Sequence, residues 1–514
     1  MTERDRILQD VVNFIEENIR NSTKTEVNYI DLKNQKSRIL TNQNHVIFGR
    51  RGAGKSSLLN VLIDGYNVKN GITLKLNMED FKDITFPNII THILIKMFQK
   101  FDFPVQKTKW FEFKKKRYLK KQRKKLKNTL TTMVKELKDM LQEPEVYTLT
   151  ETNQNNHQTS GKTKSGIGYN KLKVSREKST MNGKKTESTR TYEKDKLLNL
   201  RDKIVSYKDI LNDYSNLYNF DYIFLVLDDF YFIPRDIQSK FIDYFHRLTK
   251  DTPLFLKVAS IKFRTRLYEE DNGTYIGTEI NHDIMPIELD YTLDDFKSTT
   301  QFMRNILNQI NNKFNSHFIN ELFSGEGFNQ LCLASGGVPR DFLSLITGLL
   351  NKIISKEISK INKVEVTKIA IEQISNKINS IKSDSADELN NLEITLHYIK
   401  NEVVVKRKRN TFFIGKDEMD NNPEEYGLIK QLMDLRLIHL VNSNTSSKND
   451  GKRYEAYMVD IGLYPNSSPR GFKQANLNKI DDRSRKDEIR TSPKLNLSKL
   501  REWQKVPEVF NELN

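Results

Sequence analysis

The 514-residue sequence contains a single cysteine, Cys332, and this scarcity excludes several kinds of site. One thiol cannot form an intramolecular disulfide or supply a cysteine-based zinc site. The eight histidines offer no His/Cys pair at ligand spacing, so we expect no structural metal site. The composition is typical of a reducing compartment, and we expect a cytoplasmic protein.

Long apolar runs are also missing. No stretch reaches the ~18–20 apolar residues that a membrane span requires, and the charged segment 1–21 lacks the apolar centre of a signal peptide. We therefore expect no membrane partner. Hydrophobic residues make up only 37% of a chain that is too long for one compact core. We expect two to four folded units diluted by polar insertions.

Positive charge is abundant, but it is concentrated in one region. The net charge is +17, and segment 107–127 holds twelve Lys or Arg residues against one acidic residue. Segment 162–194 holds ten against three, so the rest of the chain is close to neutral. Such a local surplus is typical of contact with a polyanion. The alternative is a solvated helix face, because long exposed helices are often rich in lysine.

The clearest motif is the glycine-rich segment 49–56, GRRGAGKS, which matches G-x-x-x-x-G-K-[ST] between a strand pattern and a helix pattern. Gly52 and Gly54 let the backbone curl, so that successive N–H groups face a phosphate at the positive end of the helix. Lys55 would neutralise phosphate charge, and the Ser56 hydroxyl would bind Mg²⁺. The predicted ligands are ATP and Mg²⁺, and the predicted binding residues are Gly49, Arg50, Arg51, Gly52, Ala53, Gly54, Lys55, Ser56 and Ser57.

A second motif follows the apolar run 222–227, which has the pattern of a buried parallel strand. The run ends in Asp228 and Asp229. We predict that Asp228 holds Mg²⁺ together with Ser56, and that Asp229 orients or deprotonates the attacking water. The alternative for Asp229 is a helix N-cap.

Between the two motifs the pattern changes to heptad-like spacing. Apolar residues from 119 to 140 and from 197 to 218 alternate at intervals of three and four, which indicates two helices with coiled-coil seams. The polar stretch 143–191 between them has faint alternation at 146–152 and 171–179, so it is either disordered or a small β-tip. The pattern predicts a basic helical hairpin that projects from the nucleotide-binding domain. Ordinary packing of both helices against the core is the alternative.

The remaining chain completes the predicted architecture. Segments 254–261 and 284–289 have strand patterns, residues 292–381 are helical, and the order helix, strand, helix, hairpin from 389 onward is typical of a winged helix. We predict an α/β fold: a three-layer P-loop ATPase domain with an α-helical lid, an inserted helical hairpin and a C-terminal winged-helix domain. The boundaries are 1–40 for an N-terminal helix and linker, 41–107 and 220–291 for the ATPase core, 108–219 for the insertion, 292–382 for the lid, 383–465 for the winged helix and 466–514 for a polar tail. Segment 500–510 of the tail could form a docking helix.

The order of these motifs resembles the AAA+ ATPases, in particular replication initiators of the origin-recognition type and the related STAND signalling ATPases. In that resemblance Ser260, or alternatively Lys262, has the position of the sensor-1 residue. Residues 336–340, GGVPR, resemble the G-x-P-R element of the lid. Arg340 would then approach the γ-phosphate as sensor 2.

The resemblance also implies a homo-oligomer with nucleotide between protomers. Arg264 and Arg266 follow sensor 1 where a trans-acting catalytic arginine is plausible; surface ion pairs with Glu269 and Glu270 are the alternative. Two features depart from the family. Initiators usually place Glu where this chain has Asp229, which implies slow, switch-like hydrolysis, and the large basic insertion is not part of the general pattern.

Candidate nucleic-acid contacts lie in the insertion and just before the strand pattern 412–414. The expected recognition helix, 424–435, is not strongly basic, because acidic residues offset its lysine and arginine. A purely protein-binding winged helix is therefore the alternative. The predicted phosphate-contacting residues are Lys114, Lys115, Lys116, Arg117, Lys120, Lys121, Arg123, Lys124, Lys125, Lys406, Arg407, Lys408 and Arg409.

The sequence thus predicts a slow ATP-hydrolysing switch that assembles on or regulates a DNA-associated complex. No nuclease, protease or helicase motif is recognisable, so we expect a separate effector protein as partner. Analogy suggests anti-phage defence or control of a mobile element. One alternative is a STAND-type sensor that binds a protein trigger or effector and not DNA. Another is a scaffold that binds nucleotide without hydrolysing it.

Overall fold

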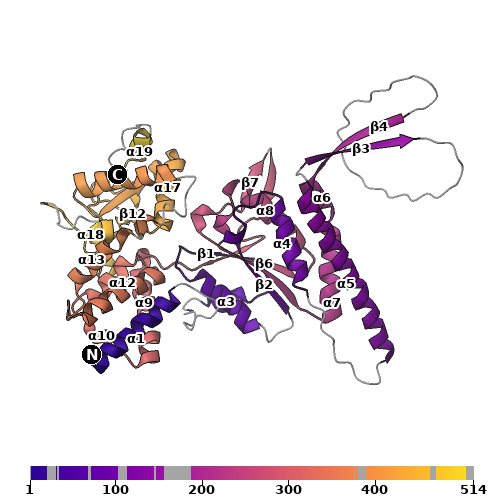
Figure 1. Ribbon diagram of the computed structural model, residues 1–514. Helices are drawn as coiled ribbons and strands as arrows, with labels where there is room; N and C mark the ends of the chain where they lie inside the picture. The colour runs from indigo at the N-terminus through magenta and orange to yellow at the C-terminus, as the bar shows by residue number, and fades with distance from the viewer. Residues whose placement is uncertain are drawn as a thin grey trace.

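The computed structural model describes residues 2–19, 31, 34–66, 71–101, 113–143, 146–154, 187–271, 273–375, 377–379, 389–463 and 470–504. Figure 1 shows two neighbouring bodies, one built around a central sheet and one mostly helical. In the described parts of the chain, no helix combines the length and apolar character that crossing a membrane would need.

The central sheet is five-stranded, with every neighbouring pair parallel. Side chains of the buried strand Tyr222–Asp228 alternate between its two faces, so Phe224 and Val226 join one apolar cluster while Leu225 and Leu227 join the other. Parallel strands present their carboxyl ends at one edge, where ligands of open α/β sheets bind. The sheet order is β2(Gly71–Asn77), β5(Tyr222–Asp228), β6(Leu254–Ser260), β1(His45–Phe48) and β9(Met285–Glu288).

Helices cover both faces of this sheet (Figure 1). Apolar residues of α2(Gln35–Ile39) and α3(Lys55–Tyr66) pack on one face. The other face carries α4(Asn88–Gln99), α7(Ile204–Tyr218) and α8(Arg235–Thr249), which share a second apolar cluster. The structure therefore confirms the predicted α/β class at the level of a parallel sheet between helical layers.

The predicted projecting hairpin is wrong for its helices. Leu126, Leu130, Leu137 and Met140 of α5(Phe113–Gln142) are buried in the same apolar cluster as α4. The physical reason is α4 itself, which buries eight of its twelve residues and so needs partners on the side away from the sheet. The second seam is also not one helix, because α6(Lys196–Asp202) ends just before α7 begins.

Only an antiparallel ribbon, β3(Val146–Gln154) paired with β4(Glu187–Asp195), extends from the top of α5 and α6 (Figure 1). The expected alternation at 146–152 therefore belongs to a β-tip, and the alternation at 171–179 lies outside the described residues. An unexpected small hairpin, β7(Tyr268–Asp271) with β8(Thr274–Gly277), follows β6.

After the sheet, the chain is helical as far as residue 379 in its described parts. The first helix of the chain, α1(Glu3–Asn18), packs on these helices. The ring centroids of Phe14 and Phe314 are 5.2 Å apart. The helices are α9(Phe296–Phe314), α10(Ile319–Leu322), α11(Gly327–Ala334), α12(Pro339–Ile354) and α13(Lys363–Glu372).

The following region is an antiparallel sheet of order β10-β12-β11 with helices around it. Its first helix, α15(Leu389–Ile399), continues as a π-helix over Lys400–Lys406. Two short helices separate the first strand from the hairpin. The elements are β10(Thr411–Gly415), α16(Lys416–Asn421), α17(Pro423–Asp434), β11(Ile438–Ser446) and β12(Arg453–Val459).

The expected polar tail is wrong for residues 470–504. This segment forms α18(Asp482–Ile489) and α19(Leu497–Gln504), and it buries Leu477, Ile489 and Leu500. Arg485 is buried too and donates to the carbonyl of Leu293 at 2.6 Å, which ties the segment to the helical region. The apolar residues of this segment are few and widely spaced, so its polar average composition did not predict that they would be buried.

One apolar cluster runs through α1, the helices α9–α13 and all the elements from α15 to α19. We call this unit the C-terminal body: α1 together with the described residues from 292 to 504. The sheet core comprises the described residues from 34 to 291. The lid and the winged-helix region, which were predicted as separate domains, therefore share one core. Because close-packed interiors transmit displacement, a shift of one region would displace the other.

Candidate nucleotide-binding site

The glycine loop joins β1 to α3 at the carboxyl edge of the sheet. Gly52 and Gly54 have φ angles of 87° and 95°, which favour glycine. A Cβ on Gly52 would also come within 2.6 Å of the Cβ of Arg340. The helix that begins at Lys55 points its N-terminus at the loop, and the positive end of a helix dipole favours an anion there.

Lys55 is buried beneath this loop. Its Nζ donates to the carbonyl oxygens of Gly49 at 2.9 Å and Arg50 at 3.3 Å. Burial lowers the pKa of Lys55, and the charges of Asp229, Asp290 and Asp228 oppose that shift. The ammonium group is therefore held inside the loop, facing the acidic residues of the neighbouring strands.

Asp228 and Asp229 end β5 on the same edge. Asp229 occupies the N-cap position of the short helix Phe230–Phe232, as the alternative proposed, but it has a φ of 53° and its side chain makes no capping hydrogen bond. Burial and the charge of Asp228 raise the pKa of Asp229, whereas Lys55, Arg51 and Arg340 lower it. These interactions bring together the two motifs that the sequence separates by more than 170 residues.

A residue that sequence reasoning missed lies beside this pair. Lys75 of β2 places its Nζ 3.0 Å from Oδ2 of Asp228 and donates to Oδ1 of Asn60 at 3.1 Å. The other oxygen of Asp228, Oδ1, accepts from the backbone N–H of Asp229 at 3.1 Å. Segment 72–76, ITLKL, alternates in the way a strand does, and a lysine at the polar position of such a pattern is ordinarily solvated.

Arg50, one of the predicted nucleotide-binding residues, makes its described contacts within the protein. Its backbone N–H donates to Oδ1 of Asp290 at 2.9 Å, and its guanidinium donates to the carbonyl of Tyr291 at 2.7 Å. The reason is the sheet order, because β9 lies beside β1 and delivers Asp290 next to the loop. Arg51 instead interacts electrostatically with Asp229 and Arg340.

Ser260 is fully buried at the end of β6, beside the loop. Its Oγ lies 2.5 Å from Oγ1 of Thr265, which itself donates to the carbonyl of Ile261 at 2.6 Å. Ser260 must therefore donate its proton to Thr265, since a hydroxyl has one proton. Its carbonyl accepts from the N–H of Gly49 at 3.3 Å, so its backbone supports the loop. Lys262 pairs with Glu288 at 2.7 Å.

Arg340 is the second residue of α12, and its N–H lies 3.4 Å from the carbonyl oxygen of Gly52. Burial lowers the pKa of Arg340, and Arg436 and Arg51 lower it further. The structure therefore brings this predicted residue from the C-terminal body to the glycine loop. Its positive charge also interacts with Asp229 across the site.

The two predicted catalytic arginines are placed differently. The guanidinium of Arg264 lies 5.2 Å from the ring centre of Tyr231, and Nζ of Lys55 lies 5.9 Å from the same ring. Arg266 is about half exposed and sits 3.7 Å from Glu269, which is the ion pair considered as the alternative. A role in a neighbouring protomer stays a prediction for both.

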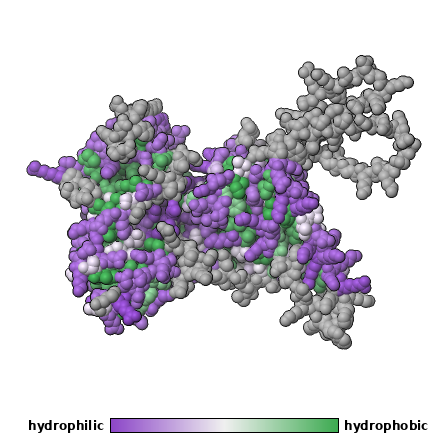
Figure 2. Space-filling view, in the orientation of Figure 1, coloured by the Kyte–Doolittle hydropathy of each residue, from purple (hydrophilic) through white to green (hydrophobic). Residues whose placement is uncertain are grey.

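The predicted nucleic-acid contacts form two groups. On α5, Arg117, Lys120, Lys121, Lys124 and Lys125 are exposed, and this part of the helix is hydrophilic in Figure 2. Arg123 is half-buried over the ring of Tyr218, while nothing is described for the side chains of Lys114, Lys115 and Lys116. In the second group, Lys406 pairs with Glu402 and Lys408 donates to the carbonyl of Arg470 at 2.7 Å.

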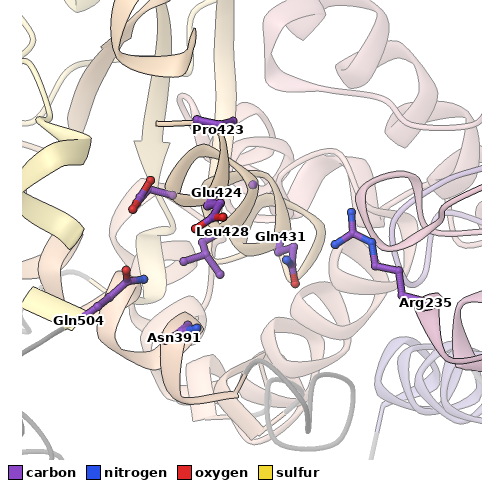
Figure 3. A pocket seen from close by; sticks show the side chains of 9 residues that line it. Arg235, Asn391, Pro423, Glu424, Leu428, Gln431 and Gln504 are labelled. Atoms are coloured by element: carbon purple, nitrogen blue, oxygen red, sulfur yellow. The ribbon is translucent and has the colours of Figure 1, made fainter. Parts of the chain in front are cut away.

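The expected recognition helix, α17, faces the sheet core. Oδ2 of Asp434 accepts from the N–H of Phe263 at 3.2 Å, and Glu425 pairs with Arg501 of α19 at 2.7 Å. A cavity of about 430 Å³ separates α17 from α8, with Gln431 on one side and Arg235 on the other (Figure 3). One end of this helix therefore contacts the sheet core, while its apolar side chains pack inside the C-terminal body.

Comparisons with known proteins gave structural neighbours only. No family model matches the chain, and no curated protein matches it. The Drosophila ORC structure bound to DNA aligns over 89% of this chain and 90% of that one, with a TM-score of 0.36 and 10% identity. The Aeropyrum pernix ORC1 protein in complex with DNA aligns over 90% of each chain, with a TM-score of 0.32 and 10% identity.

Proposed function

We propose that this protein binds ATP between its glycine loop and the Asp228–Asp229 pair and hydrolyses it slowly. One observation carries the proposal: the loop, the acidic pair and Arg340 come from three distant segments and interact electrostatically at one edge of the sheet. A chance glycine-rich turn would have no reason to gather these charges.

Each residue has a defined task in this proposal. The first N–H groups of α3 hold the phosphates, and Lys55 exchanges the carbonyls of Gly49 and Arg50 for phosphate oxygens. Asp229 accepts a proton from the attacking water, and its raised pKa makes it a better base. Arg340 approaches the terminal phosphate from the C-terminal body.

The residues present also fit Mg²⁺. Ser56 on the first turn of α3 and Asp228 at the end of β5 supply the hard oxygen ligands that this ion prefers. When bound, Mg²⁺ would neutralise charge on the phosphates. Lys75 holds a positive charge against the same carboxylate.

Hydrolysis and binding are tested separately. Lys55→Ala should abolish ATP binding in calorimetry, because the buried ammonium is lost. Asp229→Asn should bind ATP normally but release phosphate at least ~100-fold more slowly, the range expected for a lost general base. Asp229→Glu, with one more methylene, should hydrolyse faster than the natural protein. If Asp229→Asn releases phosphate at the natural rate, Asp229 is not the base. If the natural protein binds ATP and releases no phosphate, the chain is a nucleotide-binding scaffold.

We propose that the exposed basic row on α5 binds the phosphate backbone of DNA. Arg117, Lys121 and Lys124 recur at intervals of three and four, so they lie on one helix face. Replacing all three by Glu should weaken duplex binding and flatten its salt dependence. Lys135→Glu with Lys138→Glu, on the C-terminal half of the same helix, is the control. Equal binding by both variants would remove α5 from the interface.

The resemblance to AAA+ initiators and STAND ATPases, and the homo-oligomer that it implies, belong to the same proposal. Light scattering with and without ATP tests assembly, and Arg266→Ala should prevent any ATP-induced assembly if it acts in trans. Control of a defence or mobile-element effector remains the wider hypothesis.

A second candidate is a signalling switch that binds a protein trigger and not DNA. The observation that favours it is α17, the expected recognition helix, which is occupied by contacts with the turn after β6 and with α19. Mobility shifts with duplex DNA, with and without ATP, distinguish the two candidates. Absence of binding at low salt in both conditions would favour the protein-binding switch.

A further inference from the structure

The C-terminal body touches the sheet core just where α17 ends. Asp434 accepts from the N–H of Phe263 in the turn after β6. Two residues later the chain turns back, and Arg436, with a φ of 66°, donates to Oδ1 of Asp341 at 2.5 Å. The side chains of Asp341 and Arg436 are only 9% and 8% exposed, so this ion pair is removed from water.

The pair belongs to a larger buried network. Nζ of Lys377 lies 3.3 Å from Oδ2 of Asp341 and 2.7 Å from Oδ2 of Asp460. His439 is also 2.8 Å from Oδ2 of Asp460, and burial lowers its pKa, which favours the neutral imidazole. Two cations and two carboxylates therefore balance one another, and removing any one leaves a buried charge uncompensated.

This network stands directly behind the predicted phosphate-sensing residue. Asp341 follows Arg340 at the start of α12, so fixing Asp341 also fixes the backbone that carries Arg340. The charges of Arg436, Asp341 and Asp229 all act on Arg340. The backbone N–H of Arg340 lies 3.4 Å from the carbonyl oxygen of Gly52, so the residue next to Asp341 is in contact with the glycine loop.

We infer that Arg436 is a positioning residue of the nucleotide site: it never touches nucleotide, but through Asp341 it holds Arg340 against the glycine loop. This inference rests on the proposed ATP site. It makes the contact between the C-terminal body and the sheet core part of that site. By linkage, a ligand that stabilises this contact would raise the affinity for ATP relative to ADP, and ATP would raise the affinity for that ligand by the same factor.

The test is the ratio of affinities for ADP and a non-hydrolysable ATP analogue, measured by calorimetry with Mg²⁺. Arg340 is expected to contact only the γ-phosphate, so Arg436→Met should lower the preference for the ATP analogue roughly tenfold and leave ADP affinity nearly unchanged. Arg436→Lys keeps the charge but not the planar fork, and should retain part of the preference. Arg501→Met is the control, because it breaks another arginine–carboxylate pair of the C-terminal body, in which Arg501 is half exposed and Glu425 is buried.

A double-mutant cycle adds a second measurement. If Arg436 acts through Asp341, Asp341→Asn combined with Arg436→Met should lower the preference no more than either change alone. Equal losses for both nucleotides would mean a purely structural role and would overturn the inference. An unchanged ratio of ATP-analogue to ADP affinity in Arg436→Met would overturn the inference as well. If the methionine variant does not fold, an unchanged ratio in Arg436→Lys has the same consequence. If the natural protein binds neither nucleotide, the proposed function itself fails.

Discussion

At the scale of single residues, the site is defined by charges that compensate one another. Lys55 faces Asp228, Asp229 and Asp290, while Arg340 faces Asp229. Two of the residues that matter most for this balance, Lys75 and Asp434, carry no motif. Each gives a prediction that isolates its contribution.

Replacing Lys75 by Met should change the Mg²⁺ requirement of ATP binding. The ammonium 3.0 Å from Asp228 opposes a second cation, so its removal should lower the half-saturating Mg²⁺ concentration roughly fivefold, or about 1 kcal/mol. The measurement is ATP affinity across a Mg²⁺ titration. Lys82→Met, an exposed lysine in the turn after β2, is the control. A higher Mg²⁺ requirement would mean that Lys75 orients Asp228 instead.

Asp434→Asn should flatten the dependence of stability on pH. Burial, reinforced by Asp290, raises the pKa of Asp434 to about 8 in the folded protein, against about 3.9 in an unfolded chain. The folded state retains the proton, so this stabilisation is complete below pH ~4 and is lost as pH rises through about 8. Asparagine still accepts from Phe263 and does not ionise.

Melting temperatures between pH 5 and 8.5 measure this effect. The melting temperature of Asp434→Asn, relative to that of the natural protein, should increase as pH rises across that range. Asp417, whose side chain is 83% exposed, provides the control. The curve of melting temperature against pH for Asp417→Asn should run parallel to that of the natural protein. Parallel curves for Asp434→Asn would contradict the raised pKa.

At the scale of elements, α4 decides how the insertion is arranged. Its residues are buried nearly all round, so α5 and α7 close the layer above it instead of projecting. Leu137→Ala should therefore destabilise the fold by about 2–5 kcal/mol, as expected for a fully buried leucine. Denaturant unfolding measures the loss. Leu119→Ala, at a half-buried position of the same helix, should cost much less, and equal small losses would support a projecting hairpin.

At the scale of the whole molecule, the C-terminal body depends on its last described segment. Leu477, Ile489, Leu495, Leu497 and Leu500 are all at most 3% exposed, and each buried side chain contributes roughly 1.5–3 kcal/mol. A chain that ends after Leu463 should lose the cooperative melting of this body and expose apolar surface. A chain that ends after Gln504 should melt like the full protein, and similar melting of both would contradict the packing described.

The local chemistry was predictable from the sequence. The glycine loop, the strand that ends in Asp228 and Asp229, and the parallel sheet follow from spacing and from continuous apolar runs, because these depend on neighbours in the chain. Contacts between distant segments were not predictable. The pairing of Lys75 with Asp228 follows from the placement of β2 beside β5, and Arg50 turns toward Asp290 because β9 lies beside β1.

The sequence by itself therefore determined the glycine loop between a strand and a helix, because that feature lies in a short, continuous stretch of backbone. Only the tertiary structure decided where the insertion packs, that residues 470–504 belong to a folded body, and that α17 faces the sheet core. Each of these depends on which apolar surfaces and buried charges meet across hundreds of residues. The network of Arg436, Asp341 and Lys377 exists only because three separate segments meet behind Arg340.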